Sequence, residues 1–224
     1  MKKLFAAAGL GAAATAYVEW LQPYQMHWGA TQHEVSRPLP SDEVVADATW
    51  NARAVTVAAT PEQIWPWLLQ LGWGRAGWYG YDWVDNLGRP SAWKILPEHQ
   101  HIEVGKDFPM SPWTAEYCVA FEEPHWMLWQ GSPPKGAADD RAAGGLLAGA
   151  AQGLVTSGGT CLWFLDPVDE RHTHLITRMR DHYRWSSPLL AGQLAVDVFD
   201  IFFMRKCLLG IKGRAEAAVR GEIG

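Results

Sequence analysis

The chain has 224 residues, enough for one large domain or two small ones, and 48% of them are hydrophobic. With 19% charged residues, this composition supports a full buried core and shows no signature of intrinsic disorder. The net charge of −5, without any Lys/Arg run, excludes a surface for binding nucleic acid.

The N-terminus combines Lys2 and Lys3 with an uncharged run from Leu4 to Val18. As a helix the run measures roughly 22 Å, which is short against a bilayer core of about 30 Å. Residues 1–21 therefore form a signal peptide, a short membrane anchor or an Ala-rich helix packed on the domain. If the segment inserts, the lysines place the rest outside the cytoplasm, and we expect a membrane-associated or exported protein. A packed helix would leave the protein cytoplasmic.

The next part of the chain divides into a connector and the start of a domain. Residues 22–48, with "RPLPSDEVV", predict a connector that wraps the domain, which itself covers 49–224. Residues 49–60 predict a first strand, because Arg53, Val55 and Val57 alternate with Ala52 and Ala54. Thr60 and Pro61 begin a helix that ends at Gly72. A second short helix is expected over 78–88.

Residues 100–183 favour antiparallel strands, and the chain ends in a helix. Alternation within residues 115–122 places Ala115, Tyr117, Val119 and Phe121 on one face. Residues 133–159 predict a long connection with a weak helix at 146–154. The expected strands lie within 101–110, which contains a Gly-Lys-Asp turn at 105–107, and at 114–123, 125–132, 160–168 and 172–183. The helix follows Pro188. This order predicts a single α+β domain in which a curved sheet is closed by a long helix.

The segment "GWGRAGWYGYDWVDNLG" (72–88) places five aromatic residues among glycines. Glycine weakens any regular element that it interrupts, so the segment predicts an irregular connection that turns its rings inward. The chain has 14 tryptophans, which indicates a bulky core, a ring-lined pocket or an interfacial surface.

Several stretches together resemble a known superfamily: "PEQIWPWLLQLGWGRAGWYGYDWVDNLG", "WGAT", "RPLPSDEVV", "ILPEHQHIEVG" and "LLGIKGRAE". From about residue 26 to 219 the chain is similar to the SRPBCC superfamily of START-like and polyketide-cyclase-like helix-grip proteins. The resemblance implies a curved antiparallel sheet wrapped around a long C-terminal helix, with two short helices after the first strand. It also implies a deep, mostly apolar cavity. Its members include lipid carriers, hormone receptors, cyclases and co-chaperone-like binders, which share no catalytic motif.

The leading functional hypothesis is binding or carrying a small hydrophobic ligand, a lipid or an aromatic, polyketide-like molecule, without a cofactor. The alternatives are a cyclase or dehydrase on a polyketide-like substrate, and an interaction module at a membrane surface, contacted through the N-terminal segment. A polar cluster inside the cavity would favour the enzyme, and exposed rings on one outer patch would favour the membrane module. The expected ligand-binding residues are Tyr79, Tyr81, Asp82, Trp83, Trp113, Tyr117, Phe199 and Phe203.

The remaining candidates for chemistry have simpler explanations. No nucleophile motif is present, so the sequence identifies no catalytic residue. The pairs His99/His101 and His172/His174 are expected to be solvated strand ends, with a metal site as the alternative. Arg178, Arg180 and Arg184 favour a solvated outer face; if buried, they need carboxylates such as Glu116 or Glu122. Cys118, Cys161 and Cys207 are predicted to be buried small hydrophobes.

Overall fold

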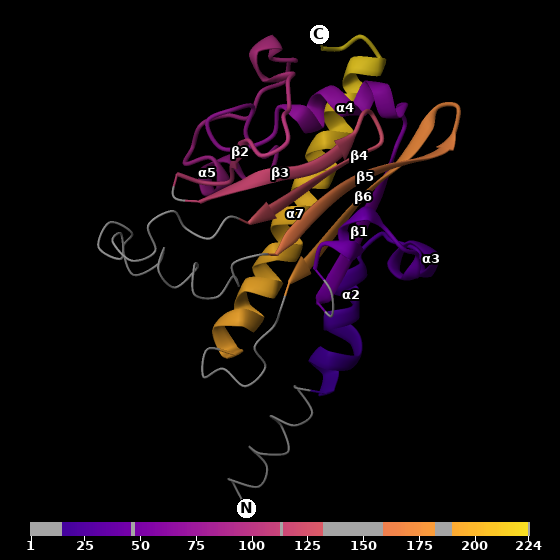
Figure 1. Ribbon diagram of the computed structural model, residues 1–224, viewed down its shortest axis with the longest axis vertical. Coiled ribbons are helices and arrows are strands. Elements are labelled where there is room, and N and C mark those ends of the chain that lie inside the picture. The colour runs from indigo at the N-terminus through magenta and orange to yellow at the C-terminus, as the bar shows by residue number, and fades with distance from the viewer. Residues whose placement is uncertain (1–14, 46–47, 113, 132–158, 182–189, 224) are drawn as a thin grey trace, which may run out of the picture.

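The computed structural model describes residues 15–45, 48–112, 114–131, 159–181 and 190–223. They form two layers, a curved six-stranded sheet and the long helix α7 (Leu190–Val219), which crosses one face of the sheet (Figure 1). We call the face toward α7 the inner face and the opposite one the outer face. The predicted α+β class, with a curved sheet closed by a C-terminal helix, is confirmed.

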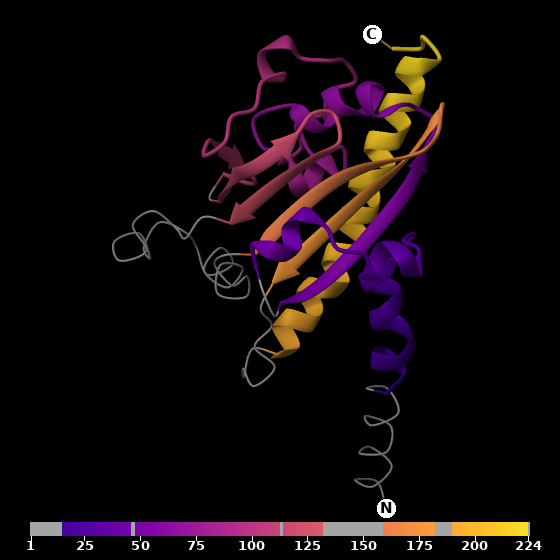
Figure 2. The same ribbon diagram turned by 45° about the vertical axis from the view of Figure 1, so that its right-hand side comes forward.

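The sheet is antiparallel throughout, with the order β1-β6-β5-β4-β3-β2, so that the first strand pairs with the last (Figure 2). In the segment 101–110, Gly105 has a φ of 79° within the expected turn, and only the residues after it form a strand. The strands are β1 (Thr49–Val57), β2 (Asp107–Pro109), β3 (Ala115–Glu122), β4 (Trp126–Gly131), β5 (Thr160–Asp169) and β6 (His172–Asp181).

Two helices follow β1, as predicted. Helix α4 (Pro61–Leu69) begins with a capping box, in which the Thr60 N–H donates to Gln63 Oε1 at 2.9 Å. Helix α5 (Asp82–Asp85) is a single turn, shorter than the expected 78–88. The reason is that Tyr79 has a φ of 57°, a left-handed conformation that an α-helix cannot contain.

Residues 22–48, predicted as a connector, are largely helical. The segment follows η1 (Tyr17–Leu21) and contains α2 (Gln22–His27), α3 (Gln32–Ser36) and η2 (Pro40–Glu43). Helix α3 begins with a capping box between Thr31 and Glu34, a sequence signal that the prediction missed. Helix α2 contacts β1 and α7, and η2 contacts β5 and β6.

The segment from α2 to η2 buries the arginines of β6, which the sequence placed on a solvated face. Arg178 and Arg180 lie on the outer face, and Asp42 of η2 accepts from Nη1 of each, at 3.0 and 2.9 Å. Arg178 also donates to the carbonyl of Val35. The expectation was wrong, because η2 covers these side chains and supplies the acceptors that buried guanidinium groups require. The carboxylate is Asp42 and neither Glu116 nor Glu122; Arg184 lies outside the described residues.

The main core lies between the inner face, α4 and α7. Cys118, Cys161 and Cys207 are buried and free, as predicted. Within the described ranges, no helix combines the length and apolarity needed to cross a membrane. Residues 1–14 of the N-terminal hydrophobic segment and the weak helix expected at 146–154 lie outside those ranges.

Candidate functional site

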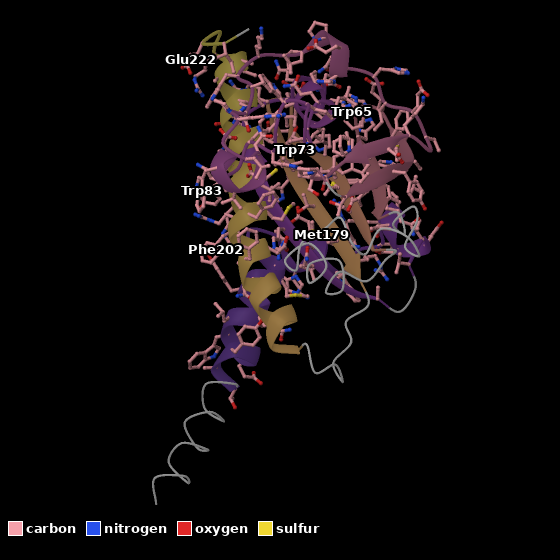
Figure 3. All side chains as sticks on the ribbon, turned by 90° about the vertical axis from the view of Figure 1, so that its left-hand side faces the viewer. Trp65, Trp73, Trp83, Met179, Phe202 and Glu222 are labelled. Carbon is pink, nitrogen blue, oxygen red and sulfur yellow. The ribbon has the colours of Figure 1, made fainter. Side chains whose placement is uncertain are left out.

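The inner face carries a row of side chains that runs across five strands below α7. The register pairs them in order, and Figure 3 places Met179 on the side of the sheet toward α7. Polar residues occupy both ends, with Glu116 two residues from Cys118 on β3, and Asn51 and Arg53 on β1. The members of the row are Cys118, Trp129, Cys161, Met179 and Asn51.

Glu116 is an ionisable group on the inner face, and no counter-charge lies beside it among the described residues. Its cross-strand partner is Phe108, which belongs to the main core. The residue is half-buried as a whole, whereas its Oε2 atom is buried and has no hydrogen-bond partner in the described part of the chain. Desolvation raises the pKa of this carboxyl from 4.5 to about 7. Glu116 therefore exists in both protonation states near neutral pH.

Arg53, at the other end of the row, is buried and satisfied. Its Nη1 pairs with Asp200 of α7 at 2.5 Å, and its Nε donates to the carbonyl of Gln25 at 2.7 Å. Four strand spacings separate β1 from β3, roughly 19 Å on a flat sheet, so Arg53 does not neutralise Glu116. Asn51, beside Arg53, has a buried Oδ1 atom with no partner among the described residues.

Aromatic rings line the inner face beside Glu116. Phe108 stacks on Trp129 with ring centroids 3.8 Å apart, and Trp163 lies 5.9 Å from Trp129. Trp78 contacts both Phe108 and Phe203 of α7, each at 6.2 Å. The indole N–H groups of Trp129 and Trp163 are buried and have no acceptor in the described ranges. The interior thus combines apolar rings with unpaired donors and one titratable acceptor.

The aromatic segment 72–88 divides between the interior and the surface. Tyr79 is 2% exposed, and its hydroxyl donates to the Trp67 carbonyl and accepts from Gln70. Tyr81 and Trp83 face outward; Trp83 is 76% exposed. The prediction that the glycines turn all of these rings inward was wrong, because the left-handed turn at Tyr79 directs the following residues away from the core. Asp82 accepts from the N–H and hydroxyl of Ser91, a local structural role.

The other expected ligand-binding residues are also spread over several places. Tyr117 lies on the outer face, where its hydroxyl donates to Gln130, because a bulge between Cys118 and Ala120 shifts the alternation of β3. Phe203 packs against the core, whereas Phe199 is 55% exposed. Trp113 lies outside the described residues. Phe203 and Tyr79 remain within the interior, and their ligand-binding role stays a prediction.

Arg53, Asn51 and Asp200 were not among the expected site residues, although one signal was present. The alternation of β1 places Arg53 on the same face as Val55 and Val57, which predicts a buried cation. No local pattern identifies Asp200 as its partner, because the two residues are 147 positions apart.

His101, His172 and His174 each lie beside a different carboxylate. His172 lies 2.9 Å from Asp169, His101 lies 3.2 Å from Glu103, and His174 contacts Glu34 of α3. His99 ends the short helix η3 (Pro97–His99) instead of a strand. Among the described residues, no group of three or more His, Cys, Asp or Glu side chains is arranged to hold a metal ion.

A pocket of about 310 Å³ opens beside β2 and β3 and reaches Phe108 and Cys118 of the inner face. Arg75, on its wall, donates to the carbonyls of Leu69 and His99 and lies over the Phe108 ring at 5.2 Å. These bonds fix the loop after α4, so Arg75 has a local structural role. The residues that line the pocket are Leu69, Arg75, Glu98, His101, Ile102, Glu103, Lys106, Asp107, Phe108 and Cys118.

Three features define the topology of the chain: β1 lies beside the last strand, two short helices follow β1, and α7 crosses the inner face. The chain has the helix-grip fold. No family model matches the sequence, and no curated protein matches it either.

Solved helix-grip structures resemble the chain at low identity. One is a protein from Mesorhizobium loti, with 12% identity and a TM-score of 0.43 over 74% of this chain and 96% of that one. A polyketide-cyclase-like protein from Corynebacterium glutamicum has 12% identity and a TM-score of 0.43, covering 79% and 97%. Norcoclaurine synthase from Thalictrum flavum, in complex with dopamine and hydroxybenzaldehyde, has 11% and 0.40, covering 83% and 94%. Likeness at this level says nothing of this chain's ligand.

Proposed function

We propose that the protein binds a small, mainly apolar molecule between the inner face and α7, with a polar group of that molecule bonded to Glu116. The observation that carries the proposal is the buried Glu116 Oε2 atom, which has no partner among the described residues and lies beside the rings of Phe108 and Trp129. Buried polar atoms are nearly always hydrogen-bonded in native proteins. A ligand hydroxyl, phenol or carbonyl would supply the missing bond.

The rest of the inner face suits an aromatic or polycyclic body. Met179 and Phe203 pack on the core but remain partly exposed, so the described residues do not cover all of their apolar surface. The unpaired indole N–H groups of Trp129 and Trp163 favour a ligand that also carries an oxygen acceptor. An apolar pocket with few polar groups that fix orientation is typical of small-molecule sites.

A second function, acid–base catalysis on the bound molecule, is favoured by the same carboxyl. A pKa of about 7 lets Glu116 accept and return a proton near neutral pH. The tyrosines do not suit this role: Tyr79 is fully hydrogen-bonded, and burial raises its pKa further. Tyr81 lies on the surface and Tyr117 on the outer face. The enzyme hypothesis, a cyclase or dehydrase on a polyketide-like substrate, therefore rests on Glu116.

Binding can be tested with a matched pair of probes, 2-naphthol and naphthalene, titrated against tryptophan fluorescence. We expect the wild type to prefer naphthol by about fivefold to tenfold, the value of one hydrogen bond. Glu116→Gln is expected to reduce that preference at pH 8, where the wild-type carboxylate accepts from the phenol. Glu122→Gln, an exposed change on the same strand, is the control. An equal preference in wild type and Glu116→Gln would contradict the proposal.

Carrier and enzyme differ in the fate of the ligand. Native mass spectrometry of protein purified from its own host should show a retained small molecule. After that molecule is returned to the empty protein, a carrier leaves it chemically unchanged. A dehydrase or a dehydrating cyclase releases a product lighter by one water, and a cyclase without dehydration releases an isomer that chromatography separates from the ligand. Loss of that product in Glu116→Gln, with ligand still bound, would assign the catalytic role.

A further inference from the structure

The outer side of α7 is an aromatic surface that the core does not use. Ile201, Met204, Cys207 and Leu208 face the sheet and are buried. Phe199, Phe202 and Lys206 follow one another at intervals of three and four residues, so they form a stripe on the opposite side. Phe202 is 59% exposed, and Figure 3 shows Phe202 and Trp83 projecting from the same side of the molecule, away from the sheet. Exposed rings in such a group mark an interaction surface.

Two cations lie within this surface. Lys206 Nζ is 5.9 Å from the centre of the Tyr81 ring, and the Arg205 guanidinium is 5.1 Å from that of Trp28. In the described part of the chain, neither cation forms an ion pair. The nearby carboxylates are already engaged, since Asp85 accepts from the Tyr81 N–H and Asp200 pairs with Arg53. The surface is thus apolar and cationic, although the chain carries a net charge of −5.

The N-terminal segment extends the same surface. Helix α2 contacts α7, and η1 and α2 expose Trp20, Leu21 and Tyr24. The uncharged sequence from Leu4 to Val18 leads directly into η1. An apolar stretch of 15 residues is therefore attached where the exposed rings begin. Rings with polar tips, together with Lys and Arg, are typical of the boundary between lipid and water.

We propose that this surface, made of Phe199, Phe202, Tyr81, Trp83, Arg205 and Lys206, docks on an anionic lipid bilayer. The rings enter the headgroup layer while the two cations pair with lipid phosphates. The docking side is opposite the sheet, so it does not depend on the ligand proposed for the interior.

The test uses the full chain and vesicles of phosphatidylcholine, with or without about a quarter phosphatidylglycerol. Cosedimentation and a blue shift of tryptophan emission report binding. We expect binding to anionic vesicles to fall by at least about tenfold in Trp83→Ser/Phe202→Ser. Val168→Ser, exposed at the β5–β6 turn, should bind like the wild type. Arg205→Gln/Lys206→Gln should lose about fivefold per cation on anionic vesicles and nothing on neutral ones.

Two other outcomes would contradict the proposal. Unchanged binding of Trp83→Ser/Phe202→Ser would mean that the N-terminal segment anchors the chain alone, and would overturn the proposal. A dimer in light scattering that Phe202→Ser dissociates, without vesicle binding, would assign the surface to a second copy and also overturn it. Because the substituted rings are exposed, thermal melts of the variants should match the wild type and exclude misfolding as the cause.

Discussion

Glu116 couples the interior of the protein to pH. Its pKa is about 7 in the folded chain against an ordinary 4.5, because burial penalises the carboxylate. Between these two values the folded state holds more protons than the unfolded state, so the stability falls as pH rises. The stability that protonated Glu116 confers is complete below about pH 4.5 and is lost as pH passes 7.

Glu116→Gln should remove this dependence. The variant is expected to gain stability relative to wild type between pH 5 and 8, with a slope approaching about 1.4 kcal/mol per pH unit. Urea denaturation at several pH values measures the difference. The opposite sign, with wild type gaining stability over Glu116→Gln as pH rises, would show that a cation outside the described residues pairs with this carboxyl.

Asp42 neutralises two buried guanidinium groups at once. Asp42→Asn would leave Arg178 and Arg180 without a counter-charge, and the expected loss of unfolding free energy is about 3–5 kcal/mol. Asp166→Asn is the control, because the Asp166–Arg37 pair is more exposed and should cost less than about 1 kcal/mol. Similar losses of unfolding free energy for both variants in denaturant titrations would mean that Asp42 is not the main counter-charge of the buried arginines on the outer face.

Helix α7 and the loop that carries Tyr79 approach each other through a glycine. A Cβ atom built on Gly210 would lie 2.0 Å from the Tyr79 carbonyl oxygen, whereas one on Gly213 would meet nothing within 4 Å. Gly210 thus permits the backbone contact that holds the left-handed Tyr79 against the helix.

Gly210→Ala and Gly213→Ala form a matched pair on one helix. Gly213→Ala should stabilise the protein by up to about 1 kcal/mol, the difference in helix propensity. Gly210→Ala should instead destabilise it by about 1–3 kcal/mol, because the methyl group forces the loop away from α7. Thermal melts compare the two, and a stabilising Gly210→Ala would mean that the loop contact is loose in solution.

The sequence predicts helices and strands well where one periodic pattern of apolar residues runs through the whole element. The prediction fails where the backbone departs from that pattern. The helix at α4 and the strands β3 to β6 follow from capping and alternation. The face of Tyr117 does not, because one bulge between Cys118 and Ala120 reverses the alternation of β3. Likewise, the positive φ of Tyr79 prevents the predicted helix over 78–88 from beginning at its first residues, and Trp83 lies on the surface. No periodicity in the sequence encodes either irregularity.

The whole molecule is closed by contacts that join distant parts of the chain. Helix α2 supplies the Gln25 carbonyl to Arg53, and η2 supplies Asp42 to β6. Such partners can be inferred from the sequence only as a need for a counter-charge, since local patterns do not reveal which residue meets it. For that reason burial of Arg178 and Arg180 was considered only as an alternative to a solvated face, and neither Asp42 nor the Arg53–Asp200 pair was identified.

Truncation separates the N-terminal segment from the domain. Removal of residues 1–14 should leave a cooperative thermal melt, because the contacts described for η2, α2 and β1 remain. Removal of residues 1–30 should lower the melting temperature, since Arg53 loses the Gln25 carbonyl and Arg205 loses Trp28. A complete loss of cooperative melting in the shorter truncation would show that residues 1–14 pack on the domain as an integral helix.

The pairing of Arg53 with Asp200 also has a consequence for synthesis on the ribosome. The two residues are 147 positions apart, so at a typical rate of 5–20 residues per second the chain waits about 7–30 s before Arg53 can meet its partner. During that interval β1 also lacks β6, and the sheet cannot close. The apolar run Leu4–Val18, by contrast, emerges ahead of the domain. Targeting factors and chaperones would therefore encounter this segment while the domain is still unfolded.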